Sequence, residues 1–194
     1  MQKHLHIGLY FGSFNPIHNG HLSLANYLID NNYVDEIWLV VSPQNPFKQN
    51  KLQLPAQTRF SLAKKAVGNY QHIKVSDIEF DLPQPNYTIN TLRILSQTYP
   101  LYKFSLIIGA DNVNEFNRWK SYEDILKNYS VLVYPRTEYP INELLPSMYL
   151  LKKAPLFPFS STTVREKIMN GEDISKLVPA SIKDQCIELY IQMP

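Results

Sequence analysis

The sequence predicts an α/β fold, in which a doubly wound parallel sheet carries helices on both faces and a short helical C-terminal extension follows. Apolar runs rich in β-branched and aromatic residues alternate with segments of helical periodicity, an order typical of a parallel sheet. Residues 37–41 and 104–108 are nearly unbroken apolar runs, which suits strands buried on both faces. The 194 residues, 44% of them hydrophobic, are enough to form such a core.

The expected elements alternate along the chain. Strands are predicted where β-branched and aromatic residues cluster, at residues 5–11, 37–41, 73–78, 104–108 and 131–134. Helices are predicted between them, where apolar residues recur at helical spacing, at residues 21–30, 56–67, 89–98 and 121–126. The apolar faces of the first three helices are formed by Leu22, Ala25, Leu28 and Ile29, by Phe60, Ala63 and Val67, and by Leu92 and Leu95.

Beyond Tyr134 the pattern changes to loops interrupted by proline. A short apolar stretch follows at residues 148–151, and helices are expected to start near Thr162 and near Ala180. We expect one Rossmann-like domain over residues 1–194, in which the part from about residue 147 packs on the same sheet.

Composition narrows the class of protein. The 19 basic and 17 acidic residues give a net charge of +2, which provides no broad basic surface for nucleic acid or for an anionic membrane. A single cysteine, Cys186, excludes an intrachain disulfide and fits a reducing compartment. No apolar run approaches the roughly 20 residues of a membrane span, and no signal peptide is recognisable. We therefore expect a soluble cytoplasmic protein, and we leave open whether it forms a homo-oligomer.

The loop after the first strand carries the first candidate site, because ligands of open parallel sheets lie outside the carboxyl ends of the strands. It runs from Gly12 to His21 and leads into a helix. His18 and His21 stand three residues apart at the helix start, where unpaired N–H groups favour a phosphate. The alternative is that one histidine caps the helix and the other is a buried structural residue. Because the glycines, the strand and the amphipathic helix all agree, the functional interpretation is favoured.

A second helix start lies far along the chain, at Ser160-Ser161-Thr162-Thr163-Val164-Arg165. Serine or threonine caps the first turn, and Arg165 stands one turn in, within reach of phosphate oxygens. Taken alone, this segment could be an ordinary capped surface helix.

These two segments resemble the paired motifs of the HxGH nucleotidyltransferases, G-[ST]-F-x-P-x-H-x-G-H and S-S-T-x-[IV]-R. Class I aminoacyl-tRNA synthetases share the HxGH loop, but they need an anticodon-binding region and a lysine-rich loop that this chain lacks. The resemblance implies transfer of a nucleoside monophosphate from a nucleoside triphosphate, with His18, His21 and Arg165 as catalytic residues. It implies that ATP is bound by these three and by Gly12, Ser13, Phe14, Gly20, Gly109, Asp111, Ser160, Ser161 and Thr162.

A third set of residues resembles nicotinate-nucleotide adenylyltransferase in particular. Gly109 and Asp111 form a G-x-D with Trp119 eight residues further on, and residues 87–92 match Y-T-x-x-T-L. This resemblance implies transfer of AMP from ATP to nicotinate mononucleotide, giving deamido-NAD and pyrophosphate. The alternatives are a dual-specificity enzyme that also accepts the nicotinamide mononucleotide, or a catalytically silent nucleotide-binding module.

The pyridine ring needs an aromatic face, and Trp119 is the candidate, with Tyr87 nearby. The resemblance implies that backbone N–H groups near Thr88 and Lys120 hold the nicotinate carboxylate, although the family often has an aromatic residue where Lys120 stands. The alternative for Trp119 is core packing, and the alternative for Asp111 is the cap of a short helix.

The phosphate of the mononucleotide needs cations or other polar partners. The resemblance implies Lys48, and Arg136 and Asn15 complete the expected substrate-binding residues. Arg59 is either a further phosphate contact or a solvated surface residue. The sequence shows no cluster of carboxylates that would bind a metal ion, so we expect no resident metal site. We expect Mg²⁺ to arrive bound to ATP.

Overall fold

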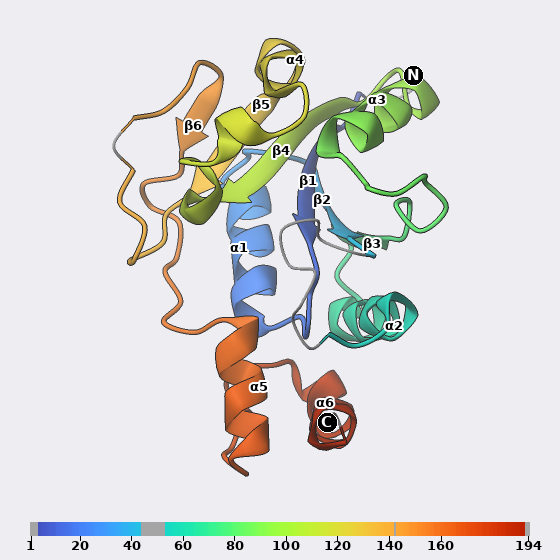
Figure 1. The fold of residues 1–194 in the computed structure, drawn as a ribbon, viewed down its shortest axis with the longest axis vertical. Coiled ribbons are helices and arrows are strands. Elements are labelled where there is room, and N and C mark those ends of the chain that lie inside the picture. Colours follow the sequence, from blue (N-terminus) through green and yellow to red (C-terminus); the bar gives the residue numbers. More distant parts are fainter. Residues whose placement is uncertain (1–3, 44–52, 142, 193–194) are drawn as a thin grey trace.

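In the computed structural model, residues 4–43, 53–141 and 143–192 are described, and within them six strands form one parallel sheet (Figure 1). The strands are β1 His6–Gly12, β2 Glu36–Val41, β3 Ile73–Ser76, β4 Lys103–Gly109, β5 Ser130–Tyr134 and β6 Met148–Leu150. Their order is β3-β2-β1-β4-β5-β6, and each neighbouring pair is parallel. The predicted doubly wound α/β fold is confirmed. The order reverses between β1 and β4, which is where such sheets bind ligands.

Helices cover both faces of this sheet. They are α1 Asn19–Asp30, α2 Ala56–Val67, α3 Thr88–Thr98, α4 Tyr122–Asn128, α5 Ser161–Met169 and α6 Lys183–Ile191. In Figure 1, α5 and α6 lie together at one end of the molecule, near α1 and α2. None of the helices in the described ranges is long and apolar enough to cross a membrane.

Two hydrophobic clusters form the core, one on each face of the sheet. Tyr10 of β1 joins the cluster that includes Leu28 of α1, Ala63 of α2 and Cys186 of α6. The neighbouring strand residue, Leu9, joins the other cluster, with residues of α3 and α4. Because successive side chains of a strand point to opposite faces, the unbroken apolar strands supply both clusters at once.

Most element boundaries differ from the expectations by one to three residues, and three differences have a visible cause. β3 ends at Ser76 rather than near Ile78, because the Ile78 N–H donates to Ser76 Oγ at 3.3 Å and turns the chain. Ser121 precedes α4 in a left-handed conformation with φ 51°, so that helix starts at Tyr122. The stretch at residue 148 is a sixth strand, which the sequence analysis did not assign, since three residues are too short for a visible pattern.

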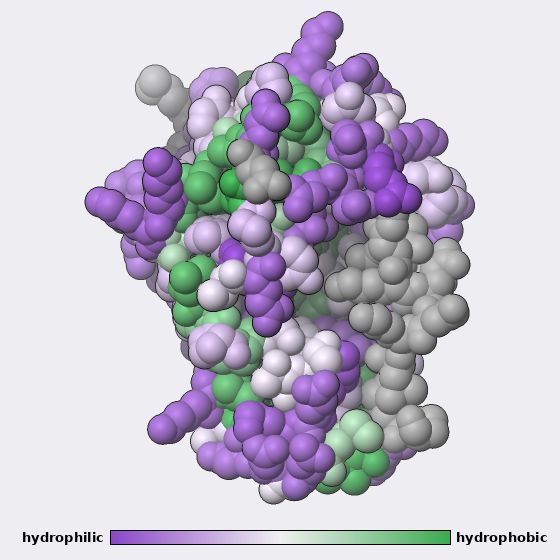
Figure 2. All heavy atoms as spheres, turned by 60° about the vertical axis from the view of Figure 1, so that its left-hand side comes forward, coloured by the Kyte–Doolittle hydropathy of each residue, from purple (hydrophilic) through white to green (hydrophobic). Residues whose placement is uncertain are grey.

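The surface carries apolar side chains in separate places. On the face that Figure 2 presents, hydrophobic residues form separate areas with polar residues between them. Large exposed apolar side chains occur on several elements, among them Tyr149 of β6, Met169 of α5 and Ile191 of α6. Scattered exposure of this kind is normal for a globular protein.

Candidate active site

The site lies where β1 and β4 end side by side. β1 ends at Gly12 and runs into the loop that leads to α1, while β4 ends at Gly109 and runs into the short 3-10 helix η2, Ala110–Asn112. The chain thus departs from two adjacent strands at the point where the strand order reverses, which is the place where sheets of this kind bind ligands.

Two histidines stack on each other at the start of α1. The ring centroids of His18 and His21 are 3.6 Å apart and the rings are inclined by 25°. The backbone N–H of His18 donates to Nδ1 of His21 at 3.1 Å, and the Phe14 ring makes an edge-to-face contact with the His21 ring. Because Nδ1 of His21 accepts a hydrogen bond, the neutral ring carries its proton on Nε2, the atom that can donate to a phosphate oxygen.

His18 is a neutral imidazole inside the protein. It is 7% exposed, and burial, followed by the positive charge of Arg136, lowers its pKa to about 3. Its Nδ1 is buried and makes no hydrogen bond within the described residues. His18 is the N-cap residue of α1, and its side chain and that of His21 face each other's backbone N–H groups as a capping box.

The start of α5 lies against the loop that precedes the histidines. Ser161 Oγ donates to the carbonyl of Pro16 at 2.9 Å, and Arg165 Nη1 donates to the carbonyl of Asn15 at 2.7 Å. The second Arg165 nitrogen, Nη2, donates to Thr162 Oγ1 at 3.0 Å. The two motifs, separated by about 150 residues, are thus in direct contact.

A reciprocal cap stabilises this helix start. The N–H of Thr163 donates to Ser160 Oγ at 3.3 Å, and the N–H of Ser160 donates to Thr163 Oγ1 at 3.2 Å. Such a capping box satisfies two backbone donors and stabilises a helix by roughly 1 kcal/mol. It sets the direction in which Arg165 leaves the first turns of α5.

The first turn of α1 is less open than the sequence suggested. The backbone N–H of Asn19 donates to the carbonyl of Leu177 at 2.7 Å, and Asn19 Nδ2 donates to the carbonyl of Lys176 at 2.9 Å. The segment between α5 and α6 therefore caps this helix from outside, and its first amide is not available to a phosphate.

An ion pair lies at the ends of β4 and β5. Arg136 Nε is 3.2 Å from Asp111 Oδ1, and Arg136 Nη2 donates to the hydroxyl of Tyr134 at 2.8 Å. A Cβ on Gly109 would lie 2.3 Å from Asp111 Oδ1, so only glycine allows this carboxylate to fold back on the strand end. Arg136 is thus placed beside Asp111, one of the residues expected to contact ATP.

Tyr10 is a site residue that the sequence analysis missed. Its hydroxyl donates to Tyr134 at 3.1 Å, and its ring meets the edge of His21 at 5.8 Å between centroids. It connects the histidine pair with the Tyr134–Arg136 contact. Its position on a buried strand, two residues before Gly12, is the only sequence signal that could have indicated it.

The residues expected to bind the pyridine ring are Tyr87, Thr88, Trp119 and Lys120. Tyr87 and Trp119 pack against the hydrophobic cluster that includes Leu9. The Trp119 ring stacks on the fully buried Phe116, with centroids 4.9 Å apart, but Trp119 itself is only partly buried. Lys120 Nζ lies 4.4 Å from the centroid of the Tyr87 ring, and Thr88 starts α3 directly after Tyr87. Trp119 therefore packs and still offers indole surface to a ligand.

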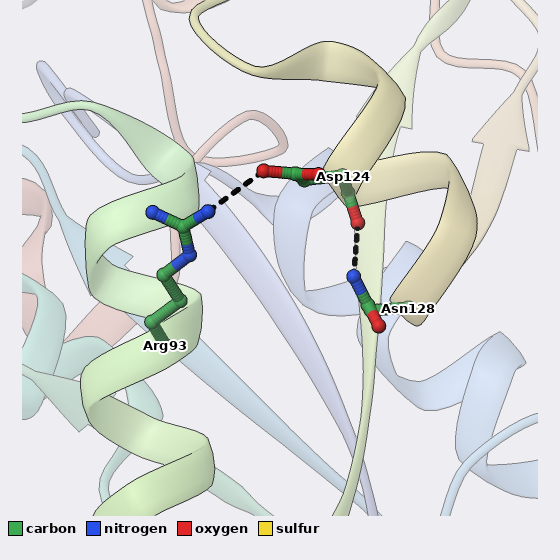
Figure 3. Close-up of polar contacts among 3 residues, drawn as sticks. All are labelled: Arg93, Asp124 and Asn128. Atoms are coloured by element: carbon green, nitrogen blue, oxygen red, sulfur yellow. Dashed lines mark hydrogen bonds and ion pairs between the residues drawn. The ribbon is translucent and has the colours of Figure 1, made fainter.

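A surface contact ties the two helices that border this side (Figure 3). Arg93 of α3 donates to Asp124 Oδ2 of α4 at 2.7 Å, and Asn128 Nδ2 donates to the carbonyl of Asp124 at 2.8 Å. Both charged side chains are about half exposed, so the pair contributes only roughly 0.2 to 1 kcal/mol. It links α3, which begins at Thr88, with α4, which follows Lys120.

Comparisons with known proteins agree with this geometry. A sequence profile described as cytidylyltransferase-like matches residues 9–167. A protein of Flavobacterium psychrophilum named "Probable nicotinate-nucleotide adenylyltransferase" is 46% identical over 179 residues, covering 91% of this chain and 93% of that protein. One of the same name from Bacteroides fragilis is 42% identical over 182 residues, covering 93% and 90%. The chain belongs to the nicotinate-nucleotide adenylyltransferase family.

A solved structure of another protein has a similar fold. The Plasmodium falciparum nicotinic acid mononucleotide adenylyltransferase complexed with NaAD superposes with a TM-score of 0.78, at 21% identity, over 97% of this chain and 98% of that chain. The family's overall fold is therefore retained here. The residue assignments within the site rest on the geometry described above.

Arg59 corrects an expectation, because it is neither a solvated residue nor directed at a ligand. It is 1% exposed, and its guanidinium donates to backbone carbonyls: Nε to Leu54 at 2.9 Å, Nη1 to Ser13 and to Ser42, and Nη2 to Pro43 at 2.9 Å. The apolar residues three, four and seven positions further along α2 face the core, which is the signal that could have predicted its burial.

Two further expected substrate residues have different outcomes. Asn15 is 5% exposed, and its Oδ1 accepts hydrogen bonds from the Leu54 N–H at 3.2 Å and from the Tyr190 hydroxyl at 2.7 Å. The structure thus gives its side-chain oxygen an internal role that the sequence analysis did not foresee. Lys48 lies outside the described residues.

The described part of the chain holds no group of three or more histidine, cysteine, aspartate or glutamate side chains that could bind a metal ion. The groups described at the site are imidazoles, two guanidinium groups, hydroxyls and the single carboxylate of Asp111, which pairs with Arg136. These are suited to phosphate oxygens rather than to a dedicated cation cage.

Proposed function

We propose that the protein transfers AMP from ATP to nicotinate mononucleotide, with deamido-NAD and pyrophosphate as products. The observation that carries this proposal is the stacked His18–His21 pair at the sheet's switch point, with Arg165 brought to the same loop from 150 residues away. The names of the relatives and the NaAD complex of the P. falciparum enzyme support it.

The ATP half of the site is assigned to the two motif loops and to the end of β4. Gly12, Ser13, Phe14 and Gly20 belong to the loop that carries the histidines, and Gly109 and Asp111 lie at the end of the neighbouring strand β4. Ser160, Ser161 and Thr162 place Arg165 against the same loop. In this proposal the histidines donate to the phosphate at which charge develops, and Arg165 holds the leaving pyrophosphate.

The acceptor half is assigned to Tyr87, Thr88, Trp119 and Lys120, with Asn15 and Arg136 nearer the reacting phosphates. The pyridinium ring stacks on the exposed part of Trp119, an interaction of roughly 0.5 to 2 kcal/mol. Lys120 stands over Tyr87, so its ammonium lies at the aromatic wall of the pocket, near where a carboxylate would be received.

Catalysis of this reaction depends on positioning the two substrates more than on proton transfer. A phosphate oxygen of the mononucleotide forms a bond to the α-phosphorus of ATP, and the bond from that phosphorus to the pyrophosphate oxygen breaks. Because the attacking phosphate is already anionic near neutral pH, no general base is required. Positioning can supply up to roughly 7 to 11 kcal/mol, and each fixed donor on the developing charge supplies a few more.

We propose Mg²⁺ as the companion of ATP, bound chiefly by triphosphate oxygens and water. The described residues fit this role because they offer phosphate donors without a carboxylate cluster of their own. When bound, the ion neutralises part of the triphosphate charge.

The direct test is pyrophosphate release by the purified chain with ATP, Mg²⁺ and nicotinate mononucleotide. Release that depends on the mononucleotide, with deamido-NAD as the coupled product, supports the proposal. ATP binding without turnover would instead identify a silent nucleotide-binding module.

Trp119→Ala is expected to raise KM for the mononucleotide by about 2-fold to 30-fold, the equivalent of the stacking energy, with ATP affinity nearly unchanged. Steady-state kinetics with each substrate varied in turn checks this prediction. Tyr122→Ala, which alters a nearby partly buried aromatic on α4, serves as the comparison. Equal losses for ATP and mononucleotide would show that Trp119 acts through packing on Phe116.

A further inference from the structure

Arg59 connects three segments that border the site. From α2 it reaches Ser13 in the loop after β1, Ser42 and Pro43 in the segment after β2, and Leu54 at the entry to α2. Every one of these hydrogen bonds ends on a backbone carbonyl. The side chain therefore fixes the backbone of one loop relative to another, whatever side chains those loops carry.

Burying the charged guanidinium of Arg59 has a cost in folding free energy. Burial of the guanidinium lowers the Arg59 pKa to about 10, which reflects the unfavourable transfer of a charge from water. A well-packed apolar side chain would fill the same space without that cost. Only the planar guanidinium offers several donors in fixed directions, so the geometry that it enforces is the feature that an apolar residue could not reproduce.

Ser42 extends the connection across the sheet. Its backbone N–H donates to the carbonyl of Gly12 at 2.9 Å, and its side chain lies close enough to the carboxyl group of Glu79 to lower the pKa of that group, against the larger effect of burial. Glu79 is 3% exposed, and its Oε1 accepts from Thr91 Oγ1 of α3 at 2.9 Å. Polar contacts thus run from the loop after β1, through the buried Arg59, the partly buried Ser42 and the buried Glu79, to the helix that begins at Thr88.

We infer that Arg59 is a positioning residue for the transfer: it sets the distance between the loop that holds ATP and the elements that hold the mononucleotide. The inference rests on the proposed function. Reacting atoms must be held about 3 to 3.5 Å apart, and a displacement of about 1 Å can cost up to 100-fold in rate. Loss of the Arg59 hydrogen bonds should therefore slow the chemical step, while each substrate, bound alone, keeps its contacts.

The experiment compares Arg59→Lys, Arg59→Met and Glu79→Gln with a matched control, Lys64→Met, on the exposed face of the same helix. Turnover is measured at least about 15 °C below the Tm of each variant, so that more than nine-tenths of the chain is folded. The dissociation constants of ATP and of nicotinate mononucleotide are measured separately by calorimetry.

The expected result is a kcat lowered at least about 10-fold in Arg59→Lys and Glu79→Gln, with each dissociation constant within about 3-fold of the wild type. Lysine keeps the charge but has a single nitrogen, which cannot span carbonyls of three segments. Lys64→Met should behave like the wild type. The kcat of Arg59→Met should fall further than that of Arg59→Lys. If Arg59→Met does not fold, the inference is tested by Arg59→Lys and Glu79→Gln.

A kcat within about 2-fold of the wild type in both Arg59→Lys and Glu79→Gln overturns the inference. The inference is also overturned if the variants change only the dissociation constants, or if the decrease in kcat is proportional to the decrease in the folded fraction. A wild-type chain without turnover overturns the proposed function itself. That result is distinguishable, because it appears before any variant is compared.

Discussion

His21→Ala is expected to lower kcat by about 10² to 10³, the size of effect that follows the loss of one preorganised transition-state donor. The His21 ring is held by stacking on His18 and by the hydrogen bond that its Nδ1 accepts. In the proposed mechanism its Nε2–H donates to the phosphate. Alanine removes that donor. His18→Ala should cause a loss of the same order. Pyrophosphate release at saturating substrates measures both.

His72→Ala is the matched control, since His72 is an exposed histidine just before β3 and should leave kcat unchanged. Circular dichroism establishes that each variant is folded before its rate is compared. Turnover by His21→Ala near the wild-type value would remove the mechanism proposed above.

The second large effect concerns the acid and the amide of the mononucleotide. The nicotinate form should be preferred by about 10² in kcat/KM. If backbone N–H groups near Thr88 and Lys120 receive the carboxylate, the amide must turn its own NH₂ donors toward one of them. Two facing donors leave a polar group unpaired, at a cost of about 1 to 3 kcal/mol, and more when the favoured ligand is charged.

The measurement compares kcat/KM for the two mononucleotides in parallel. Lys120→Ala then refines it: if the ammonium above Tyr87 helps to hold the carboxylate, KM for the acid alone should rise and the preference should narrow. Lys127→Ala, an exposed lysine on α4, is the control. Equal efficiency with acid and amide would identify a dual-specificity enzyme and would contradict the pocket assignment.

Local patterns were enough to predict most of the strands and helices. Strands such as β2 and β4 are nearly unbroken apolar runs because both of their faces are covered, so their composition identifies them. β6 was missed because only Met148 of its three residues is buried. Its pairing with β5 is a long-range contact that no local pattern reports.

The site was predictable where it consists of contiguous motifs, and not where it depends on long-range contacts. The contact of Arg165 with Asn15 required the motif resemblance, since nothing near either residue indicates the other. The capping of α1 by Leu177 and the bond between Asn15 and Tyr190 join the first loop to the last elements. Backbone carbonyls and a tyrosine hydroxyl carry no sequence signal of their partners.

The buried neutral state of His18 has a consequence for the fold in acid. The unfolded chain takes up a proton at this residue near pH 6.5, whereas the native state resists protonation down to about pH 3. Between these values the unfolded state binds more protons, so the free energy of unfolding decreases as the pH falls, by at most about 1.4 kcal/mol per unit. His6, whose pKa is also lowered by burial, acts in the same direction.

Urea unfolding between about pH 7 and pH 5 should therefore show a smaller loss of stability in His18→Gln than in the wild type, and the difference isolates His18 from His6. Equal slopes would contradict this origin. In the proposed mechanism the same residue donates to the phosphate, so a replacement of His18 that improves stability in acid should also lower turnover.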